Sequence, residues 1–429
     1  MAHESIKVAL LGAGTVGSQT ARLLVEQADE FERRIGARLE LTGIAVLDPD
    51  QVNDPWIDKS LLTTDTLELT TRADVVVELI GGIEPARTFV LSALNHGASV
   101  VTANKALLAQ HGPELYEAAE RNGVDIYFEA AVGGAIPIVR PLRESMVGDK
   151  INRIMGIVNG TTNYILDEMT TRGLAFDTVL KEAQAKGFAE ADPTADIGGF
   201  DAAAKAAIMS VLAFHRDVRM DDVHVEGIEN ITESDIEAAR AMNRVIKLLA
   251  VVSENEQGIS AGVYPIMLPA DHQLAKVSGS FNAVFVEGEA SDDLMFYGRG
   301  AGGAPTASAV TGDIVTVARH RVAGSTGPSI PLYSNAPIVD ASQAHSSYMV
   351  RFNVPDNVGV LARITEIFAQ HGVSIRAAQQ HEQEDAQGNH ELWITTHSVS
   401  DHVIRETIDD VAAEKTAGAV ISIMRVFEE

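Results

Sequence analysis

An apolar run from Ile6 to Leu11 leads directly into the glycine-rich stretch at 12–17, and apolar residues at helical spacing follow. Strand, three glycines and helix in this order predict a dinucleotide-binding βαβ unit. Gly12 permits the tight turn, Gly14 lets the backbone approach a pyrophosphate, and Gly17 allows close packing of helix on strand. The start of the helix, with Thr15 and Val16, offers free N–H groups to the anion. We therefore expect a dinucleotide-binding domain at this end of the chain.

The second predicted strand, Leu39 to Leu47, ends in Asp48-Pro49-Asp50. An acidic residue at this position binds a ribose diol in such folds, with Ala45 beside it at the strand end. No Lys or Arg lies between Ala45 and Trp56 to meet a 2′-phosphate. The sequence therefore favours NAD over NADP, unless a basic residue arrives from elsewhere. A turn residue before proline is an equally good interpretation of Asp48.

Further β/α units continue the parallel sheet, with strands at 74–80, 98–102 and 125–132 and a helix at 85–96. Ligands bind where such strands end. Lys105 follows the strand at 98–102, so we expect it at the cofactor crevice. The alternative is a solvated lysine at the start of a helix.

The whole chain limits the classes of function. Its 429 residues predict two or three domains, and a net charge of -27 argues against a nucleic-acid partner. Cysteine is absent, which excludes disulfides and thiolate catalysis. No apolar run approaches the roughly 20 residues that span a bilayer, and the first four residues do not resemble a signal peptide. We expect a cytoplasmic protein with no membrane partner.

Alternating strands at 151–158, 259–268 and 281–288, with helices at 177–186, 201–215 and 306–320, predict an α+β substrate domain. After a loop-like run with Pro331 and Pro337, strands and helices from Tyr348 onwards follow a ferredoxin-like βαββαβ pattern. Asp356 and Asn357 are expected to cap its first helix. The predicted domains are 1–132 with 304–330 packing back on it, 133–303 for substrate and dimerisation, a linker at 331–346, and 347–429.

The segment from Lys186 to Lys205 carries more charge than a buried core tolerates unpaired. Asp201 and Lys205 are four residues apart, so they share one face of a helix. A carboxylate beside an amine suits acid/base chemistry on an amino-acid-like ligand. If the fold brings Lys105 close to Lys205, each amine lowers the pKa of the other. Otherwise Lys205 is simply the ion-pair partner of Asp201.

Five motifs in order resemble the homoserine dehydrogenase family: the glycines at 12–17, Thr-Ala-Asn-Lys at 102–105, Asn-Gly-Thr-Thr-Asn-Tyr-Ile-Leu at 159–166, the 186–205 segment and Gly-Arg-Gly-Ala-Gly at 298–302. The third domain resembles an ACT-type regulatory domain, with Pro-Asp-Asn-Val-Gly-Val-Leu-Ala at 355–362 as its signature. The resemblance implies a Rossmann-type α/β domain, an α+β substrate domain and a ferredoxin-like regulatory domain. It also implies reversible reduction of L-aspartate 4-semialdehyde to L-homoserine with NAD(P)H, in threonine, methionine and isoleucine biosynthesis.

The resemblance also assigns residues. Lys205 would donate and accept the proton at the substrate oxygen, with Lys105 assisting. The implied substrate-binding residues are Glu190, Asp196, Asp201, Gly160 and Thr161, and Gly187 and Gly303 join Lys105 and the glycine motif at the cofactor. A sodium ion would be held at Glu129, Val132, Gly134 and Ile136, largely through backbone carbonyls. Phe188 departs from the family, which commonly has tyrosine there.

For the third domain we expect a threonine effector near Asn357, Gly359 and Val360, and the alternative is a purely structural dimerisation module. A homodimer or homotetramer is expected. Two other functions stay open on the residues: a non-catalytic, NAD-responsive amino-acid sensor, and a dehydrogenase of another small amino-acid aldehyde.

Overall fold

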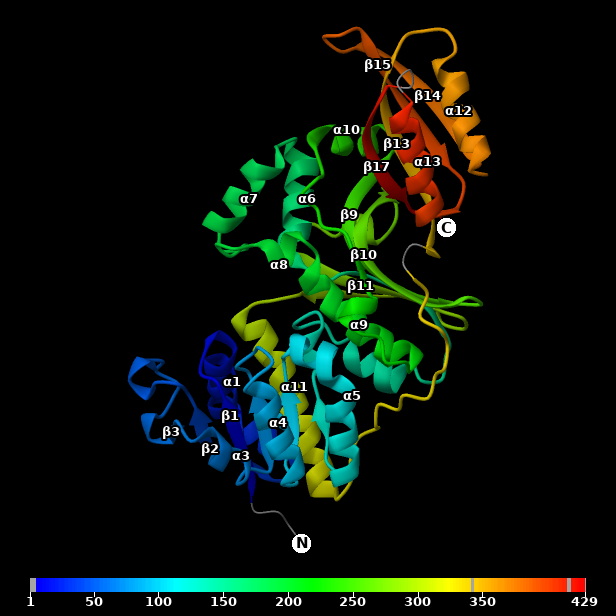
Figure 1. Cartoon of the computed structure of the whole chain (residues 1–429). Helices are drawn as coiled ribbons and strands as arrows, with labels where there is room; N and C mark the ends of the chain where they lie inside the picture. The colour runs from blue at the N-terminus through cyan, green and yellow to red at the C-terminus, as the bar shows by residue number, and fades with distance from the viewer. Residues whose placement is uncertain (1–4, 341–342, 415–417, 429) are drawn as a thin grey trace.

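The computed structural model describes residues 5–340, 343–414 and 418–428. Residues 1–4, 341–342, 415–417 and 429, parts of the expected first domain, linker and third domain, lie outside the described part. Figure 1 shows three regions: a nucleotide-binding region around the N-terminus, a mixed sheet in the middle, and a C-terminal module beyond it. The first and middle regions meet at the site described below.

The first region is a parallel sheet in the order β3-β2-β1-β4-β5-β6, with helices on both faces. This confirms the expected dinucleotide-binding architecture. Its strands are β1 (Ser5–Leu11), β2 (Arg38–Ala45), β3 (Leu62–Thr63), β4 (Val75–Glu78), β5 (Ser99–Thr102) and β6 (Ile126–Tyr127). Its helices are α1 (Thr15–Glu26), α2 (Ala28–Ile35), α3 (Thr66–Thr70), α4 (Ala86–Asn95) and α5 (Lys105–Asn122).

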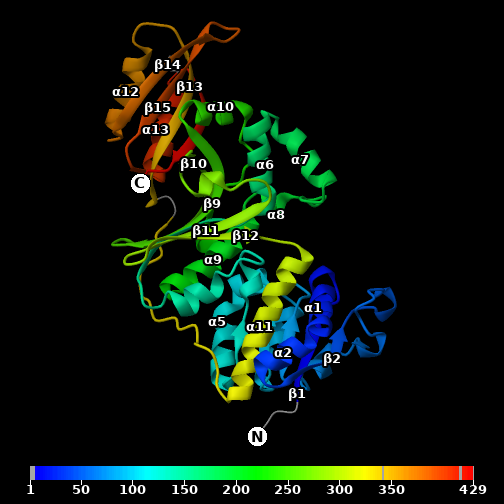
Figure 2. The same ribbon diagram turned by 180° about the vertical axis from the view of Figure 1, so that it is seen from behind.

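Helix α11 (Gly303–Ala323) comes much later in the chain but packs beside α1, as Figure 2 shows from behind. Its buried Val310, Ile314 and Val317 join the core that contains Val8 and Leu10 of β1. The helix begins three residues before the predicted start at residue 306, and its first residue, Gly303, meets the first turn of α1. The starts of α1 and α11 therefore lie side by side.

The middle region is a sheet in the order β12-β11-β7-β9-β10. Its strands are β7 (Ile151–Ile157), β8 (His224–Val225), β9 (Arg244–Asn255), β10 (Gly258–Pro269), β11 (Phe281–Gly288) and β12 (Asp292–Arg299). Its helices are α6 (Gly160–Arg172), α7 (Phe176–Ala185), α8 (Thr194–Ile197), α9 (Phe200–Phe214) and α10 (Glu233–Ala241). Short helical turns in the first two regions lie at Pro49–Gln51, Lys59–Leu61, Glu129–Ala131, Pro141–Ser145, Met220–Asp222 and Leu274–Lys276.

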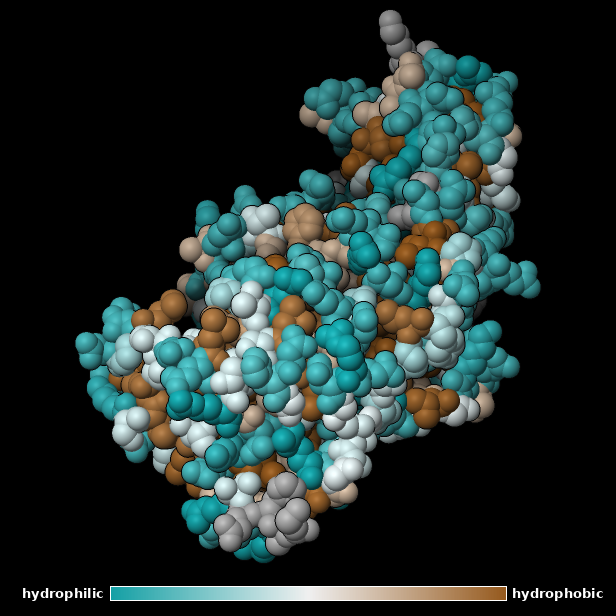
Figure 3. Space-filling view, turned by 60° about the horizontal axis from the view of Figure 1, so that its bottom comes forward, coloured by the Kyte–Doolittle hydropathy of each residue, from teal (hydrophilic) through white to brown (hydrophobic). Residues whose placement is uncertain are grey.

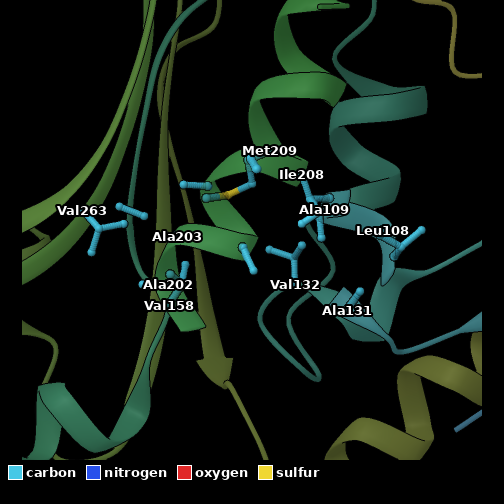
Figure 4. Packing of buried hydrophobic residues seen from close by; sticks show 14 of the residues in the cluster. Leu108, Ala109, Ala131, Val132, Val158, Ala202, Ala203, Ile208, Met209 and Val263 are labelled. Carbon is cyan, nitrogen blue, oxygen red and sulfur yellow. The ribbon is translucent and has the colours of Figure 1, made fainter. Parts of the chain in front are cut away.

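Helix α9 is apolar almost all round, which is typical of a helix buried in a core. Figure 4 shows its Ala202, Ala203 and Met209 packed in the cluster that includes Val132 and Val158. Small alanine side chains let the helix approach its neighbours closely. Any charge on this helix is therefore placed in a largely dry environment and needs a partner.

The C-terminal module has the sheet order β17-β13-β15-β14, with α12 and α13 on one side, and it confirms the expected βαββαβ pattern. Its elements are β13 (His345–Pro355), α12 (Val360–Gln370), β14 (Ile375–Glu384), β15 (Asn389–Thr396), β16 (Val399–Ser400), α13 (Asp401–Ala413) and β17 (Ala419–Val426). The capping prediction was wrong: the N-cap of α12 is Gly359, and no side chain among the described residues caps the helix.

The module shares one continuous sheet with the middle region, because β17 pairs in parallel with β10 at Ile266 and Arg425. Met349 and Met424 of the module also belong to the main hydrophobic core. Arg351, which is 1% exposed, places a guanidinium nitrogen 2.7 Å from a carboxylate oxygen of Asp235 in α10. The C-terminal module is thus joined to the middle region by sheet pairing, core packing and a buried ion pair, and not by the chain connection alone.

The surface face in Figure 3 is mostly hydrophilic, with apolar residues in scattered patches. Within the described ranges, no helix combines the length and apolar character required to cross a membrane.

Candidate active site

A cavity of about 660 Å³ lies where the first and middle regions meet. Its walls come from the first turns of α1, α5, α6 and α9, the 187–190 loop and the 299–302 loop. Residues far apart in the chain therefore face one space: Val16, Lys105, Gly160, Thr161, Gly187, Glu190, Asp196, Asp201 and Lys205.

The glycine motif has the geometry that a dinucleotide needs. Gly12 adopts a φ of +105°, and a β-carbon at Gly17 would lie 2.1 Å from the Gly12 carbonyl oxygen, so neither position accepts another residue without strain. Gly14 is the N-cap of α1, and no side chain among the described residues caps that helix. Space around Gly14 is open, which leaves the N–H groups of the first turn free for a phosphate. The residues present fit a bound nicotinamide dinucleotide.

Asp201 binds both lysines at once. Lys105 Nζ lies 2.8 Å from Asp201 Oδ1, and Lys205 Nζ donates to Asp201 Oδ2 at 2.7 Å. Lys205 also donates to the backbone carbonyl of Val158 at 2.6 Å, and it is 7% exposed. The two amines therefore meet in the cavity, with one carboxylate between them.

The Asp201 carboxylate raises the pKa of Lys105, whereas a lowered pKa was expected. Burial by itself lowers the pKa of Lys105, but the charge and hydrogen bond of Asp201, with Asp196 and Glu190 nearby, outweigh burial and raise it. Burial likewise acts to raise the pKa of Asp201, yet Lys205 and Lys105 hold it well below its usual range. The expectation that the lysines lower each other's pKa was therefore wrong for Lys105.

Asn159 organises the acidic end of the cavity. Its Oδ1 accepts from the N–H of Thr162, so it caps α6, and its Nδ2 donates to Asp196 Oδ1 at 2.7 Å and Asp201 Oδ2 at 2.9 Å. Both oxygens of Asp201 are thus already engaged. Glu190 is exposed at the edge of the same cavity. Glu190 and Asp196 are better placed than Asp201 to receive a ligand's ammonium.

Two other charged residues of the 186–205 segment have hydrogen-bond partners away from Lys105 and Lys205. Lys186 Nζ donates to the hydroxyl of Tyr164 at 2.6 Å, and Asp192 accepts from Thr194 in its own turn. Phe188 lies against the ring of Tyr164, with centroids 5.0 Å apart, and its carbonyl accepts from the Thr161 hydroxyl. The aromatic packing at residue 188 is therefore retained without a hydroxyl.

Ala45 and Asp48 lie at the end of β2 and do not line the cavity within the described residues. Asp48 is exposed, and its carboxylate accepts from the N–H of Asp50 and the amide of Gln51. The Asp48 side chain thus stabilises the turn that follows β2, which was the alternative to a role in binding the ribose. Gly303, by contrast, abuts Thr15 of α1 and follows Gly302, which lines the cavity.

The strand predicted over 125–132 is shorter in the structure: β6 ends at Tyr127, and a loop follows it. The buried carboxylate of Glu129 accepts from the N–H groups of Ile138, Val139 and Arg140, which curls the chain back on itself. Both carboxylate oxygens of Glu129 therefore already accept backbone N–H groups. In the described chain, no hydrogen bond ends on the backbone carbonyls of Val132, Gly134 and Ile136, all three of which are buried residues.

Buried Asp313 of α11 holds this loop to the first region: it accepts from the N–H of Glu129 and pairs with Arg140. Burial raises the pKa of Asp313 to about 7 against the opposing effect of Arg140.

Asn357 and Gly359 lie in the turn between β13 and α12, and Val360 is the first residue of α12, at the outer end of the C-terminal module (Figure 1). They are remote from the cavity, so any effect of a ligand there would have to pass through the module.

Sequence reasoning missed Ser280, Asn282 and Arg299 as cavity residues. Ser280 and Asn282 belong to none of the five motifs, and Arg299 lies in the 298–302 motif but was given no role. The pairing of β11 with β12, which sets Phe281 opposite Arg299, brings the three residues together.

Comparisons with known proteins agree on one family. Residues 12–129 match the model described as homoserine dehydrogenase, NAD binding domain, residues 137–315 match homoserine dehydrogenase, and residues 348–415 match the ACT domain. A homoserine dehydrogenase from Corynebacterium glutamicum is 49% identical, and the match covers 98% of this chain and 96% of that one.

Solved structures extend this likeness to the fold. A homoserine dehydrogenase from Thiobacillus denitrificans is similar with a TM-score of 0.93 and 39% identity, and covers 99% of this chain and 98% of its own. A hyperthermophilic archaeal homoserine dehydrogenase in complex with NADPH is similar with a TM-score of 0.63 and 28% identity, over 73% of this chain and 97% of that one.

Proposed function

The chain belongs to the homoserine dehydrogenase family, and from that membership we propose how its residues carry out the reaction. It is an oxidoreductase that interconverts L-aspartate 4-semialdehyde and L-homoserine with a nicotinamide cofactor. One observation carries the assignment of roles: Asp201 holds the amines of Lys105 and Lys205 inside a cavity that begins at the glycine motif.

When bound, the nicotinamide supplies or receives the hydride. Lys205 gives a proton to the carbonyl oxygen of the semialdehyde during reduction and takes it back from the hydroxyl of homoserine during oxidation. Its bonds to Asp201 and the Val158 carbonyl fix the amine at one point in the cavity. Lys105, on the other oxygen of Asp201, adds positive charge where the substrate oxygen becomes negative.

The substrate's amino-acid end lies at the acidic side of the cavity in this proposal. Glu190 and Asp196 receive the ammonium through charge-assisted hydrogen bonds. The α-carboxylate lies at the first turn of α6, where Gly160 and Thr161 offer N–H groups that have no intrahelical partner. A sodium ion fits the buried carbonyls of Val132, Gly134 and Ile136 better than the side chain of Glu129, which backbone N–H groups occupy.

The cofactor assay tests the function itself. We expect protein mixed with L-homoserine and NAD or NADP to produce reduced-cofactor absorbance, with a higher kcat/KM for NAD because residues 45–56 contain no Lys or Arg. Lys59 donates to Asn53 in the loop after β2 and is the nearest candidate for a 2′-phosphate. Lys59→Ala should therefore lower kcat/KM for NADP only. Absence of turnover with either cofactor would refute the assignment and favour the sensor alternative.

We also propose that threonine binds the C-terminal module near Asn357, Gly359 and Val360, where the first turn of α12 has no side-chain cap among the described residues. Edge strand β12 exposes Met295 and Tyr297, which supports association into a homodimer or homotetramer. A biosynthetic role of this kind is consistent with the cytoplasm.

A short strap at 226–228 provides a physical link between the module and the active site. Glu226 accepts from Arg425 of β17 at 2.6 Å and also from Arg405 of α13. Burial acts to raise the pKa of Glu226, but His224 and these arginines lower it to about 2, so it stays charged. A β-carbon at Gly227 would lie 2.3 Å from the carbonyl oxygen of Ile197 in α8, just before Asp201.

Glu226→Gln is expected to raise the threonine concentration for half-inhibition at least about tenfold, because the neutral amide loses its charge pairing with the two arginines. Activity without threonine should stay within about twofold of the unaltered protein, since Glu226 does not line the cavity. Inhibition curves at fixed homoserine measure both. Glu229→Gln, an exposed change three residues away, is the matched control. Unchanged inhibition in Glu226→Gln would exclude the strap as the link.

A further inference from the structure

The side-chain oxygen of Asn282 is buried at the catalytic cavity without a hydrogen-bond partner among the described residues. The residue is 1% exposed and lines the cavity. Its Oδ1 is buried and has no hydrogen-bond partner within the described chain. A buried polar group in this state costs stability. Such a cost at a ligand site indicates that the partner arrives with the ligand.

Two glycines keep the space around this amide open. A β-carbon at Gly300 would lie 2.0 Å from Asn282 Nδ2, and one at Gly160 would lie 3.5 Å from Asn282 Oδ1 and 2.8 Å from the Ser280 carbonyl oxygen. The amide therefore stands between the 299–302 loop and the start of α6. It is placed beside the N–H groups that we assign to the substrate's α-carboxylate.

The backbone that carries Asn282 is held firmly. Asn163 Nδ2 donates to the carbonyls of Gly279 and Phe281, at 2.9 and 3.2 Å. Buried Lys247 donates to Asn163 Oδ1 at 2.9 Å and to the Val277 carbonyl at 2.6 Å. Asn282 is therefore positioned before any ligand binds, as a recognition residue must be.

We propose that Asn282 donates a hydrogen bond to the α-carboxylate of the substrate, a role that rests on the function proposed above. The amide can turn by 180° without changing its shape, so that Nδ2 faces the start of α6. A carboxylate there would accept from Asn282 and from the N–H groups of Gly160 and Thr161. Selection of an amino acid over a simple alcohol then depends partly on Asn282, while the lysines act at the other end of the substrate.

Asn282→Ala tests this role through binding and stability together. KM for L-homoserine should rise about 10- to 100-fold, as for loss of a hydrogen bond to a charged group, with KM for the dinucleotide within about twofold. The melting temperature of the ligand-free protein should stay equal or rise, because the change removes an unsatisfied amide. Asn335→Ala, an exposed change outside the cavity, should alter none of these values.

Asn282→Asp gives a second readout, because a carboxylate at residue 282 repels the substrate's carboxylate. KM for homoserine should rise further than in Asn282→Ala. An unchanged KM in Asn282→Ala, a parallel rise in KM for the dinucleotide, or a fall in melting temperature would each overturn the proposal. If the unaltered protein does not oxidise homoserine at all, the proposed function fails instead, so the two failures are distinct.

Discussion

Lys205→Ala is expected to lower kcat for homoserine oxidation by about 10²- to 10⁴-fold, the usual contribution of a positioned acid/base group. Lys205 is the amine held at 2.7 Å from Asp201 and 2.6 Å from the Val158 carbonyl, deep in the cavity. KM for the dinucleotide should change little, because the glycine motif binds it independently. Initial rates at saturating cofactor, with both substrates varied, measure the two effects separately.

Lys186→Ala is the matched control for this experiment. Lys186 belongs to the same charged segment, but its amine reaches the Tyr164 hydroxyl and its side chain is half exposed. Its removal should change kcat by less than about threefold. Near-normal turnover in Lys205→Ala would assign the proton transfer to another group, and Lys105 would be the first to test.

Asp201→Asn should be the second most damaging change, lowering kcat by about 10²-fold because misplacing catalytic groups by about an ångström has that effect. It should also move the pH profile. The charge of Asp201 helps to raise the pKa of Lys105, so its removal lets that pKa fall. A limb of the kcat profile that follows loss of the Lys105 proton would then shift to lower pH. Rates between about pH 6 and 10 measure this shift.

Asp192→Asn is the control for Asp201→Asn, because its carboxylate only stabilises the turn at Thr194. That variant should keep the pH profile of the unaltered protein. A shift of the Asp201→Asn profile to higher pH would show that Asp201 acts on the titrating group in some way other than through its charge.

Local patterns were sufficient for the parts of the fold that depend on neighbouring residues. The run from Ile6 through Gly17 specifies strand, turn and helix within a few residues, and β1 and α1 begin within one residue of the pattern. The (i, i+4) spacing of Asp201 and Lys205 likewise predicted their contact. These features require no information from distant parts of the chain.

Features that depend on distant segments could not be predicted in this way. The pKa of Lys105 depends on Asp201, which is 96 positions away in the sequence numbering and adjacent only in the fold. Strand β9 carries a lysine, Lys247, in an otherwise apolar stretch, and its burial makes sense only beside Asn163. The sequence does not indicate a role for Asn282, because that role is inferred from a buried side-chain oxygen without a partner, which only the structure shows.

The pairing of β10 with β17 has a consequence for how the protein is made. A ribosome synthesises the chain from the N-terminus, so β10 emerges more than 150 residues before the strand that covers its edge. Until then the part of the β10 edge at Ile266 and Met267 faces the surroundings of the nascent chain. A chain that stops early, or loses its last residues to a protease, keeps that edge uncovered. Strand β17 therefore protects this part of the β10 edge from pairing with other chains.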